Sequence, residues 1–246
     1  MAAADLEGRA RLTLEAVRKA LGAESRVDLA HHHLALALDG EALTMEGEVE
    51  GVGAKRLALE RAAAVPGVRF IVDRLRVRPA RAMTDAEIRD HLCHSLLAEP
   101  AFAGHAVRCR RAGRVEALRE PAGGAGELEV EVEAGVVTLS GEVPGLGQKR
   151  LAGVLAWWVP GSRDVVNGLE VRPAEGDTEG ELADAVRLSL EKDPLVDASG
   201  IRVAVRGTVV TLSGVVSSRA QREMAEADAW YVFGVDDVRN EIEATR

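Results

Sequence analysis

Apolar and polar residues follow a pattern that repeats three times along the chain. In the first third, an apolar stripe of helical period covers residues 12–21, and strand-like alternation follows over 33–38 and 43–49. A second helical stretch over 54–64 and a strand-like run over 69–77 complete the set. Helices and strands are distinguished by their periods of 3.6 and 2 residues. The pattern therefore predicts an αββαβ unit.

The two remaining thirds begin with the same helix signal. Thr84 stands three residues before Glu87, and Thr178 stands three residues before Glu181, each time at the head of an amphipathic segment. This spacing is typical of a capping box, in which the two residues bond to each other's backbone N–H groups. In the strand-like run over 127–133, apolar and acidic residues alternate strictly, which predicts one buried and one solvated face.

Three pairs of glycines mark the repeat, and the spacing within each pair is the same. The pairs are Gly47 with Gly67, Gly141 with Gly161, and Gly214 with Gly234. Constant spacing without insertion indicates a duplicated folding unit. We expect these glycines to be structural. The first of each pair ends a strand in a conformation that other residues rarely adopt, and the second ends the preceding helix as its C-cap.

The repeat predicts an α+β protein of three tandem domains, over residues 1–80, 81–174 and 175–246. Each domain is expected to be a three-stranded sheet covered on one face by two helices. The pattern leaves open which hairpin strand the last strand pairs with. The middle domain also carries an insertion over about 108–126, for which we expect a projecting hairpin or loop.

Composition and charge narrow the classes of function. The formal net charge is −9, and residues 175–246 hold 15 acidic but only 8 basic side chains, which disfavours nucleic-acid binding. Two cysteines cannot form a disulfide framework across three domains. No apolar run reaches the roughly 18 residues of a membrane span, and the first residues lack the apolar core of a secretion signal. We therefore expect a cytoplasmic protein that associates with a membrane only peripherally.

Several motifs recur in the middle and last thirds and resemble one known family. They are GVVTLSG (135–141), TVVTLSG (208–214), the closing VPG or VFG after the second helix, and the final strands DVVNGLEV (164–171) and DDVRNEIE (236–243). The first third carries EALTMEG (41–47) and VRFIVDRLRV (68–77) in the same places. The chain thus resembles three tandem BON domains, a small bacterial module named for osmotic-stress and nodulation proteins, with the first copy diverged.

This resemblance implies the same αββαβ fold that the pattern predicts. It also implies that the protein has no enzymatic activity. Members of the family are associated with phospholipid surfaces or other ligands at the cell envelope and with protection against osmotic shock.

Basic side chains gather in the insertion and at the start of the middle domain's second helix. The candidates for binding an anionic surface are Arg108, Arg110, Arg111, Arg114, Lys149 and Arg150. Each well-placed cation near an anionic membrane contributes about 1 kcal/mol. A solvated helix face is the alternative explanation for the last two.

Aromatic pairs end the second helices of the middle and last domains. The helical stripe places Trp158 and Tyr231 in the core and leaves Trp157 and Trp230 on the flank. A flanking tryptophan suits a lipid interface or a protein contact, because its ring is apolar and carries one donor. Partial burial against the neighbouring domain is the alternative.

One metal site is conceivable from sequence. His91 and His94 lie one helical turn apart, with Cys93, His105 and Cys109 nearby, and these are zinc ligand types. However, Cys93 faces away from His91 on a helix, and the other two domains lack equivalent residues. We therefore expect neither a metal nor a cofactor.

The sequence also predicts no catalytic centre. Ser140 and Ser213 end strands beside a glycine, but Glu46 stands there in the first domain and no histidine accompanies the serines. We predict a non-enzymatic binding module that associates with anionic phospholipid or the envelope surface in an osmotic or stress response. The alternative is a cytoplasmic adaptor for protein–protein interaction. Its partner is then another protein or a second copy of the chain.

Overall fold

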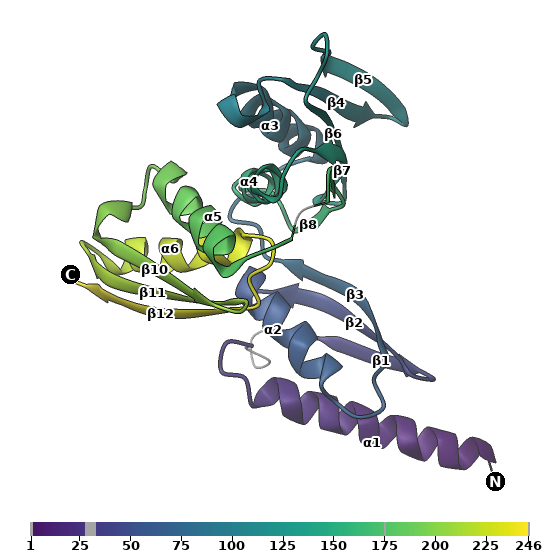
Figure 1. Cartoon of the computed structure of the whole chain (residues 1–246). Coiled ribbons are helices and arrows are strands. Elements are labelled where there is room, and N and C mark those ends of the chain that lie inside the picture. The colour runs from purple at the N-terminus through teal and green to yellow at the C-terminus, as the bar shows by residue number, and fades with distance from the viewer. Residues whose placement is uncertain (1, 28–32, 175, 246) are drawn as a thin grey trace. The chain divides into compact units, whose positions relative to one another are not determined.

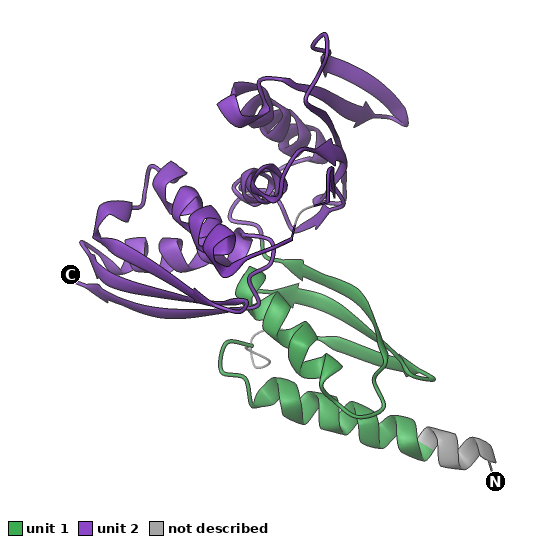
Figure 2. Ribbon diagram, in the orientation of Figure 1, with its two compact units in different colours: residues 1–78 green, residues 79–246 purple. Residues whose placement is uncertain are grey.

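The computed structural model describes residues 2–27, 33–174 and 176–245, with side chains from residue 8 onward. This described part contains six α-helices and twelve strands in three separate sheets, which confirms the α+β class (Figure 1). The chain forms two compact units, Met1–Arg78 and Pro79–Arg246 (Figure 2). The first unit holds the first copy of the repeat, and the second unit holds the other two. Within the described residues, no helix is long and apolar enough to cross a membrane.

The first unit has the element order that the sequence predicts. Its elements are α1 (Ala2–Gly22), β1 (Ala35–Asp39), β2 (Ala42–Val49), α2 (Val52–Ala63) and β3 (Phe70–Val77). The sheet has the order β1-β2-β3, with β1 antiparallel and β3 parallel to the central strand. Alternate residues such as Leu43, Met45 and Leu75 are fully buried, because the helices cover only that face of the sheet.

The middle copy contains the additional strands. Its elements are α3 (Asp85–Ala98), β4 (His105–Arg111), β5 (Arg114–Arg119), β6 (Gly126–Glu133), β7 (Val136–Val143), α4 (Leu146–Trp157), β8 (Asp164–Asn167) and β9 (Glu170–Val171). The insertion forms the hairpin β4–β5, and β4 pairs in parallel with β6. The hairpin therefore extends the sheet, whose order is β5-β4-β6-β7-β8 with β9 also on β7. This sheet has six strands where the sequence predicted three.

The third copy returns to the simple plan. Its elements are α5 (Glu179–Lys192), β10 (Ile201–Arg206), β11 (Val209–Val216), α6 (Arg219–Tyr231) and β12 (Asp237–Ala244). In all three copies the last strand runs parallel to the second hairpin strand, which answers the question of strand order. The second helix of each copy provides the crossover that a parallel pair requires.

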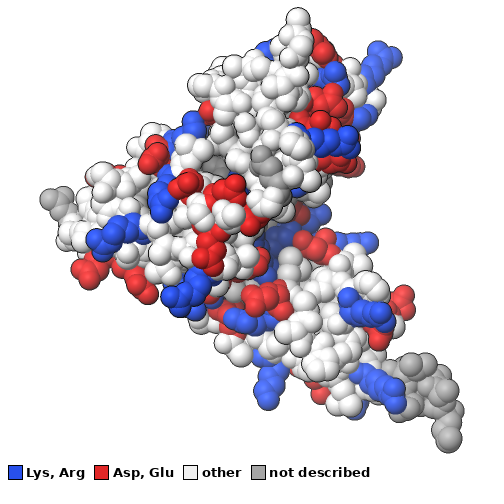
Figure 3. All heavy atoms as spheres, viewed as in Figure 1, with Lys and Arg blue, Asp and Glu red and all other residues white. Residues whose placement is uncertain are grey.

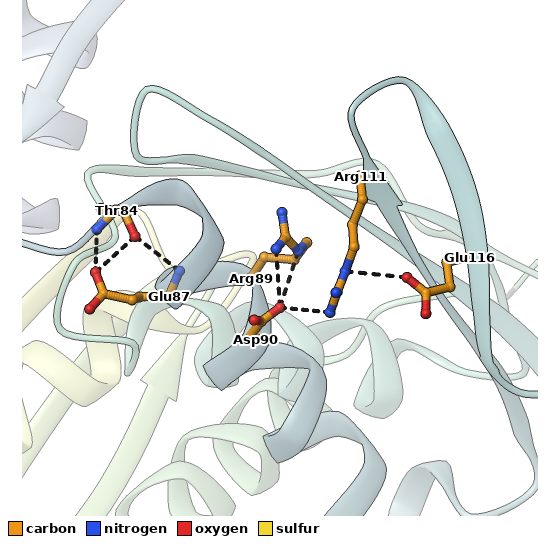
Figure 4. Close-up of polar contacts among 6 residues, drawn as sticks. All are labelled: Thr84, Glu87, Arg89, Asp90, Arg111 and Glu116. Atoms are coloured by element: carbon orange, nitrogen blue, oxygen red, sulfur yellow. Dashed lines mark hydrogen bonds and ion pairs between the residues drawn. The ribbon is translucent and has the colours of Figure 1, made fainter.

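Both predicted capping boxes are present. The hydroxyl of Thr84 accepts the N–H of Glu87 at 3.3 Å, and the Glu87 carboxylate accepts the N–H of Thr84 at 2.7 Å (Figure 4). Thr178 and Glu181 repeat the arrangement at 3.2 and 3.0 Å. Each box satisfies two N–H groups that would otherwise lack a partner at the start of α3 and α5.

The first glycine of each pair does not end its strand as expected, because β2, β7 and β11 continue for two more residues. It does adopt a positive φ, of 146° at Gly47, 120° at Gly141 and 131° at Gly214. A Cβ atom on Gly141 would also collide with the carbonyl oxygen of Glu127, and one on Gly214 with that of Gly200. The backbones of paired strands approach closely at these positions. Only glycine tolerates both the positive φ and the close approach of the neighbouring backbone.

The expectation for the second glycines was wrong in one respect, because they do not cap the helices. Helices α2, α4 and α6 end at Ala63, Trp157 and Tyr231, before the glycines. Gly67 and Gly234 adopt a positive φ in the turn that leads to the next strand. Gly161 has a packing role, because a Cβ there would lie 2.6 Å from that of Met83.

Candidate functional site

The insertion's arginines face carboxylates of the same sheet. Arg108 contacts Glu120 at 2.8 Å and Glu127 at 2.9 Å, and Arg110 contacts Glu129 at 2.6 Å. The hydrogen bond from Arg108 lowers the pKa of the Glu120 carboxyl. The sequence held a signal for these pairs. Basic residues alternate along β4 and acidic residues along β6, so their side chains meet on the face opposite the helices.

Arg111 is paired as well, but Arg114 is not. Arg111 lies between Asp90 of α3 at 3.0 Å and Glu116 of β5 at 3.4 Å (Figure 4). Arg114 is exposed next to the hairpin turn and has no ion pair within the described part of the chain. Three of the four insertion candidates for an anionic surface are therefore neutralised within the molecule.

Lys149 and Arg150 contact the third copy. The guanidinium of Arg150 donates to the carbonyl oxygen of Phe233 at 3.0 Å and pairs with Asp177. Its side chain is buried, which corrects the expectation that it offers a charge to an external surface. The Lys149 ammonium lies 4.7 Å from the centre of the Phe233 ring, in a cation–π contact. Sequence could not reveal these contacts because Asp177 lies 27 residues and Phe233 lies 83 residues from Arg150.

The aromatic residues also lie where the two copies meet. Trp157 is half-buried and stacks on Tyr231 with 5.9 Å between ring centres, which is the packing alternative that we considered. The indole N–H of Trp158 donates to Asp228 of α6 at 2.8 Å. Trp230 is 4% exposed, so its predicted place on the flank was wrong. It belongs to the core and has no exposed face for a lipid surface.

We call the contact of α4 with α5, α6 and Phe233 the junction. Besides the pair of Arg150 with Asp177, a second ion pair joins the same two copies. It is formed by Lys192 of α5 and Glu99 at the end of α3, which lie 2.9 Å apart. Asp228 is the most unusual group in the junction. Burial raises its pKa to about 7, and the nearby carboxyl of Asp193 acts in the same direction. Our sequence reasoning missed Asp228, although a carboxylate on the inward side of AEADAWY (225–231) was a usable signal.

A groove with a volume of about 240 Å³ opens between α4 and α5, beside the junction. The residues that line it are Leu146, Gly147, Arg150, Leu151 and Val154 of α4, with Glu181, Asp184, Ala185, Leu188 and Ser189 of α5. Most of this lining is apolar. The two carboxylates of α5 are exposed, and Leu188 is 37% exposed although it is a large apolar residue.

The fold does not bring together the five residues considered as zinc ligands. His91 and His94 are exposed on α3, whereas Cys93, His105 and Cys109 are buried. Burial raises the pKa of the Cys93 thiol to about 12 and lowers the pKa of His105. Across residues 2–27, 33–174 and 176–245, no three His, Cys, Asp or Glu side chains form a group that could hold a metal ion.

Comparison with known proteins gives one family and one curated relative. The model of the BON domain matches residues 13–79, 116–173 and 178–246. Osmotically-inducible protein Y of Escherichia coli (strain K12) is 35% identical over 122 residues, which are 47% of this chain and 61% of that protein. The chain thus covers about three fifths of this relative's length.

Two solved structures of CdsD, a structural protein of the type III secretion system of Chlamydia trachomatis, also align with 94% of the chain. The alignments cover 96% and 91% of the two CdsD chains, each at 13% sequence identity. Their TM-scores are 0.26 and 0.24.

Proposed function

Because this chain belongs to the BON domain family and carries three copies of the module, we propose that it is a non-enzymatic adaptor that binds a protein partner in the osmotic stress response. Similarity to an osmotically inducible protein of Escherichia coli supports the association with osmotic stress. The non-enzymatic role is what membership of the family implies. The cytoplasmic location expected from the sequence stays a prediction that cell fractionation would test.

The observation that carries the adaptor role is the apolar groove beside the junction. Binding sites are commonly concave, mostly apolar and edged by a few polar groups, and they often lie between domains. The groove has this character and takes its walls from two copies of the module. The junction supports the role, because an ion pair, a hydrogen bond and a ring stack join the two copies.

The basic residues favour a protein partner over an anionic membrane. Arg108, Arg110 and Arg111 already contact carboxylates, and Arg150 is buried. To meet lipid headgroups, these side chains would first have to leave their ion pairs. Arg114 is the candidate of the insertion that has no ion pair in the described part of the chain. Its attraction to an anionic membrane, about 1 kcal/mol, is too small for stable association.

Association with an anionic phospholipid surface is the second candidate, and the hairpin supports it. Arg114 is exposed and unpaired within the described residues, and its neighbour Val115 is also exposed. Both lie beside the turn between β4 and β5, at one end of the sheet (Figure 1). A cation beside an apolar side chain is suited to an anionic interface.

Sedimentation with vesicles separates the two candidates. We expect the full chain to remain in the supernatant with phosphatidylglycerol vesicles at low salt, as it does with phosphatidylcholine vesicles. The matched variants are Arg114→Glu and Arg206→Glu, because both arginines are exposed beside a hairpin turn. Salt-sensitive sedimentation that is lost in Arg114→Glu and kept in Arg206→Glu would favour the lipid candidate and overturn the adaptor.

Photo-crosslinking in the native cell tests the adaptor directly. A crosslinking amino acid placed at exposed Val115, Leu188 or Val215 is expected to give a discrete protein adduct at one of these positions after osmotic upshift. Adducts at none of them would contradict the proposal. Loss of the gene is expected to lower survival after the upshift, and unchanged survival would remove the link to osmotic stress.

A further inference from the structure

We propose that the groove between α4 and α5 binds the apolar face of a basic amphipathic helix from a partner protein. The inference rests on the proposed adaptor function and deepens it by naming the class of partner. The bound helix inserts one or two apolar side chains between α4 and α5, and its Lys or Arg residues meet the carboxylates of α5.

The size of the groove indicates anchoring side chains rather than a whole ligand. Its volume of about 240 Å³ is below the roughly 300–1,000 Å³ of pockets that enclose small molecules. Protein interfaces concentrate their binding energy in a few side chains that fill small pockets of this kind. Gly147 contributes to the space, because a Cβ built there meets no atom within 4 Å.

The lining explains why the anchors are apolar. Leu151 and Val154 of α4 are buried, while Leu188 of α5 remains partly exposed at the same groove. The exposed part of the Leu188 side chain would gain stability from burial against a partner. Exposed apolar patches edged by polar residues are typical of interaction surfaces.

The charges explain why the partner is basic. Glu181 and Asp184 line the groove, and Asp177 and Glu179 lie exposed just before them. Asp177 pairs with Arg150 and Asp184 with Arg187, whereas Glu179 accepts the N–H of Gly207 and Glu181 that of Thr178. The four carboxylates therefore outnumber the two arginines paired with them. Figure 3 shows acidic side chains gathered over α5. The cation that lines the groove, Arg150, is turned to Asp177 and to a backbone carbonyl. A cationic partner is attracted here, whereas an anionic headgroup would be repelled.

The walls explain why the partner is a helix. All groove-lining residues belong to the helices α4 and α5, so no strand edge offers backbone hydrogen bonds to an extended peptide. A helix satisfies its own backbone and presents side chains three and four positions apart along one line. This spacing allows neighbouring apolar side chains to enter the same groove.

A synthetic peptide provides the test with the full chain. The probe is a fluorescent 18-residue peptide of leucine and lysine, with leucine at helical spacing on one face, and its control is a scrambled peptide of equal composition. Fluorescence anisotropy is expected to show binding of the helical peptide and at least about tenfold weaker binding of the scrambled one.

Two glycine variants locate the binding. Gly147→Phe places a large side chain at the groove, at a position where a Cβ meets no atom within 4 Å, and is expected to weaken binding at least about tenfold. Gly8→Phe is the matched control, because Gly8 lies in helix α1 with the same open space and is expected to bind normally. Circular dichroism checks that both variants are folded. Asp184→Lys is expected to weaken binding and to reduce its dependence on salt.

Three results of the peptide experiment would overturn the inference. They are equal binding of the scrambled peptide, no binding at all, and unchanged binding by folded Gly147→Phe. Self-association that Gly147→Phe abolishes would assign the groove to a second copy and would overturn the assignment as well. If crosslinked protein adducts persist in Gly147→Phe, the adaptor function stands and only the groove is excluded as its site.

Discussion

The carboxyl of Asp228 lies in the junction with its two oxygens in different situations. One oxygen accepts the indole N–H of Trp158 at 2.8 Å, and the other is buried without a hydrogen-bond partner in the described part of the chain. Burial raises the pKa to about 7, and Asp193 adds to the effect. Burial also raises the pKa of the Tyr231 hydroxyl to about 12, so this neighbour is neutral near pH 7. The fold therefore favours protonated Asp228.

This preference makes stability depend on pH. Because the folded pKa of about 7 lies above the ordinary value of 3.8, the stabilising contribution is complete below about pH 4 and is lost as the pH rises through 7. Between pH 5 and pH 8, the Tm of the native protein is expected to fall by several degrees relative to that of Asp228→Asn. Calorimetry at both values measures this difference, and a constant difference would contradict the assignment.

Gly141 is the second residue whose replacement has a clear expected cost. Its φ of 120° and the closeness of the Glu127 backbone leave no room for a methyl group. Gly141→Ala is expected to lower the free energy of unfolding by about 1–3 kcal/mol. Gly147→Ala, in an open helical position, is expected to raise it by up to about 1 kcal/mol. Urea unfolding of both variants tests this contrast, which equal effects would refute.

At the scale of elements, local signals were sufficient where both partners lie close in sequence. Thr84 with Glu87 predicted a helix start because the capping box spans only four residues. The hairpin β4–β5 was recognised as an insertion, but its pairing with β6 was not predicted, because a parallel pair depends on distant strands. Trp230 was misplaced for a similar reason. Helical periodicity shows which residues share a face of α6, not which faces other elements cover.

Arg119 adds to the strand pairing and ion pairs that hold the hairpin to the rest of the middle copy. Arg119 of β5 donates hydrogen bonds to the carbonyl oxygens of Leu97, Phe102 and His105. Arg119→Ala leaves these oxygens without that donor and is expected to lower the free energy of unfolding by about 2 kcal/mol. Hydrogen exchange should then be faster in β5. Arg114→Ala, in the same strand, is the control, and equal exchange in both variants would contradict this role.

At the scale of the whole molecule, the three copies are not equivalent in their contacts. The first copy forms one compact unit by itself, and the second and third share a unit through the junction. The family and the number of copies could be predicted from the repeated motifs. The junction could not, because its residues differ between copies. The repeat therefore predicted the modules but not the contact between two of them.

Unfolding should follow these units. Calorimetry of the full chain is expected to show two transitions, one for each compact unit. Trp158→Leu removes the hydrogen bond to Asp228 and is expected to split the transition of the second unit into two. Trp157→Leu removes the ring stack and is expected to weaken the junction less. A single cooperative transition in the native chain would contradict the division.

The three tryptophans of the sequence are Trp157, Trp158 and Trp230, and all lie in the second unit. Two of them lie directly in the junction, one stacked on a tyrosine and one bonded to a carboxyl. Their ultraviolet emission is therefore a built-in optical reporter. Separation of the second and third copies would expose both indoles to water and shift their fluorescence emission to longer wavelengths. Unfolding of the first copy, which contains no tryptophan, would leave the emission spectrum unchanged.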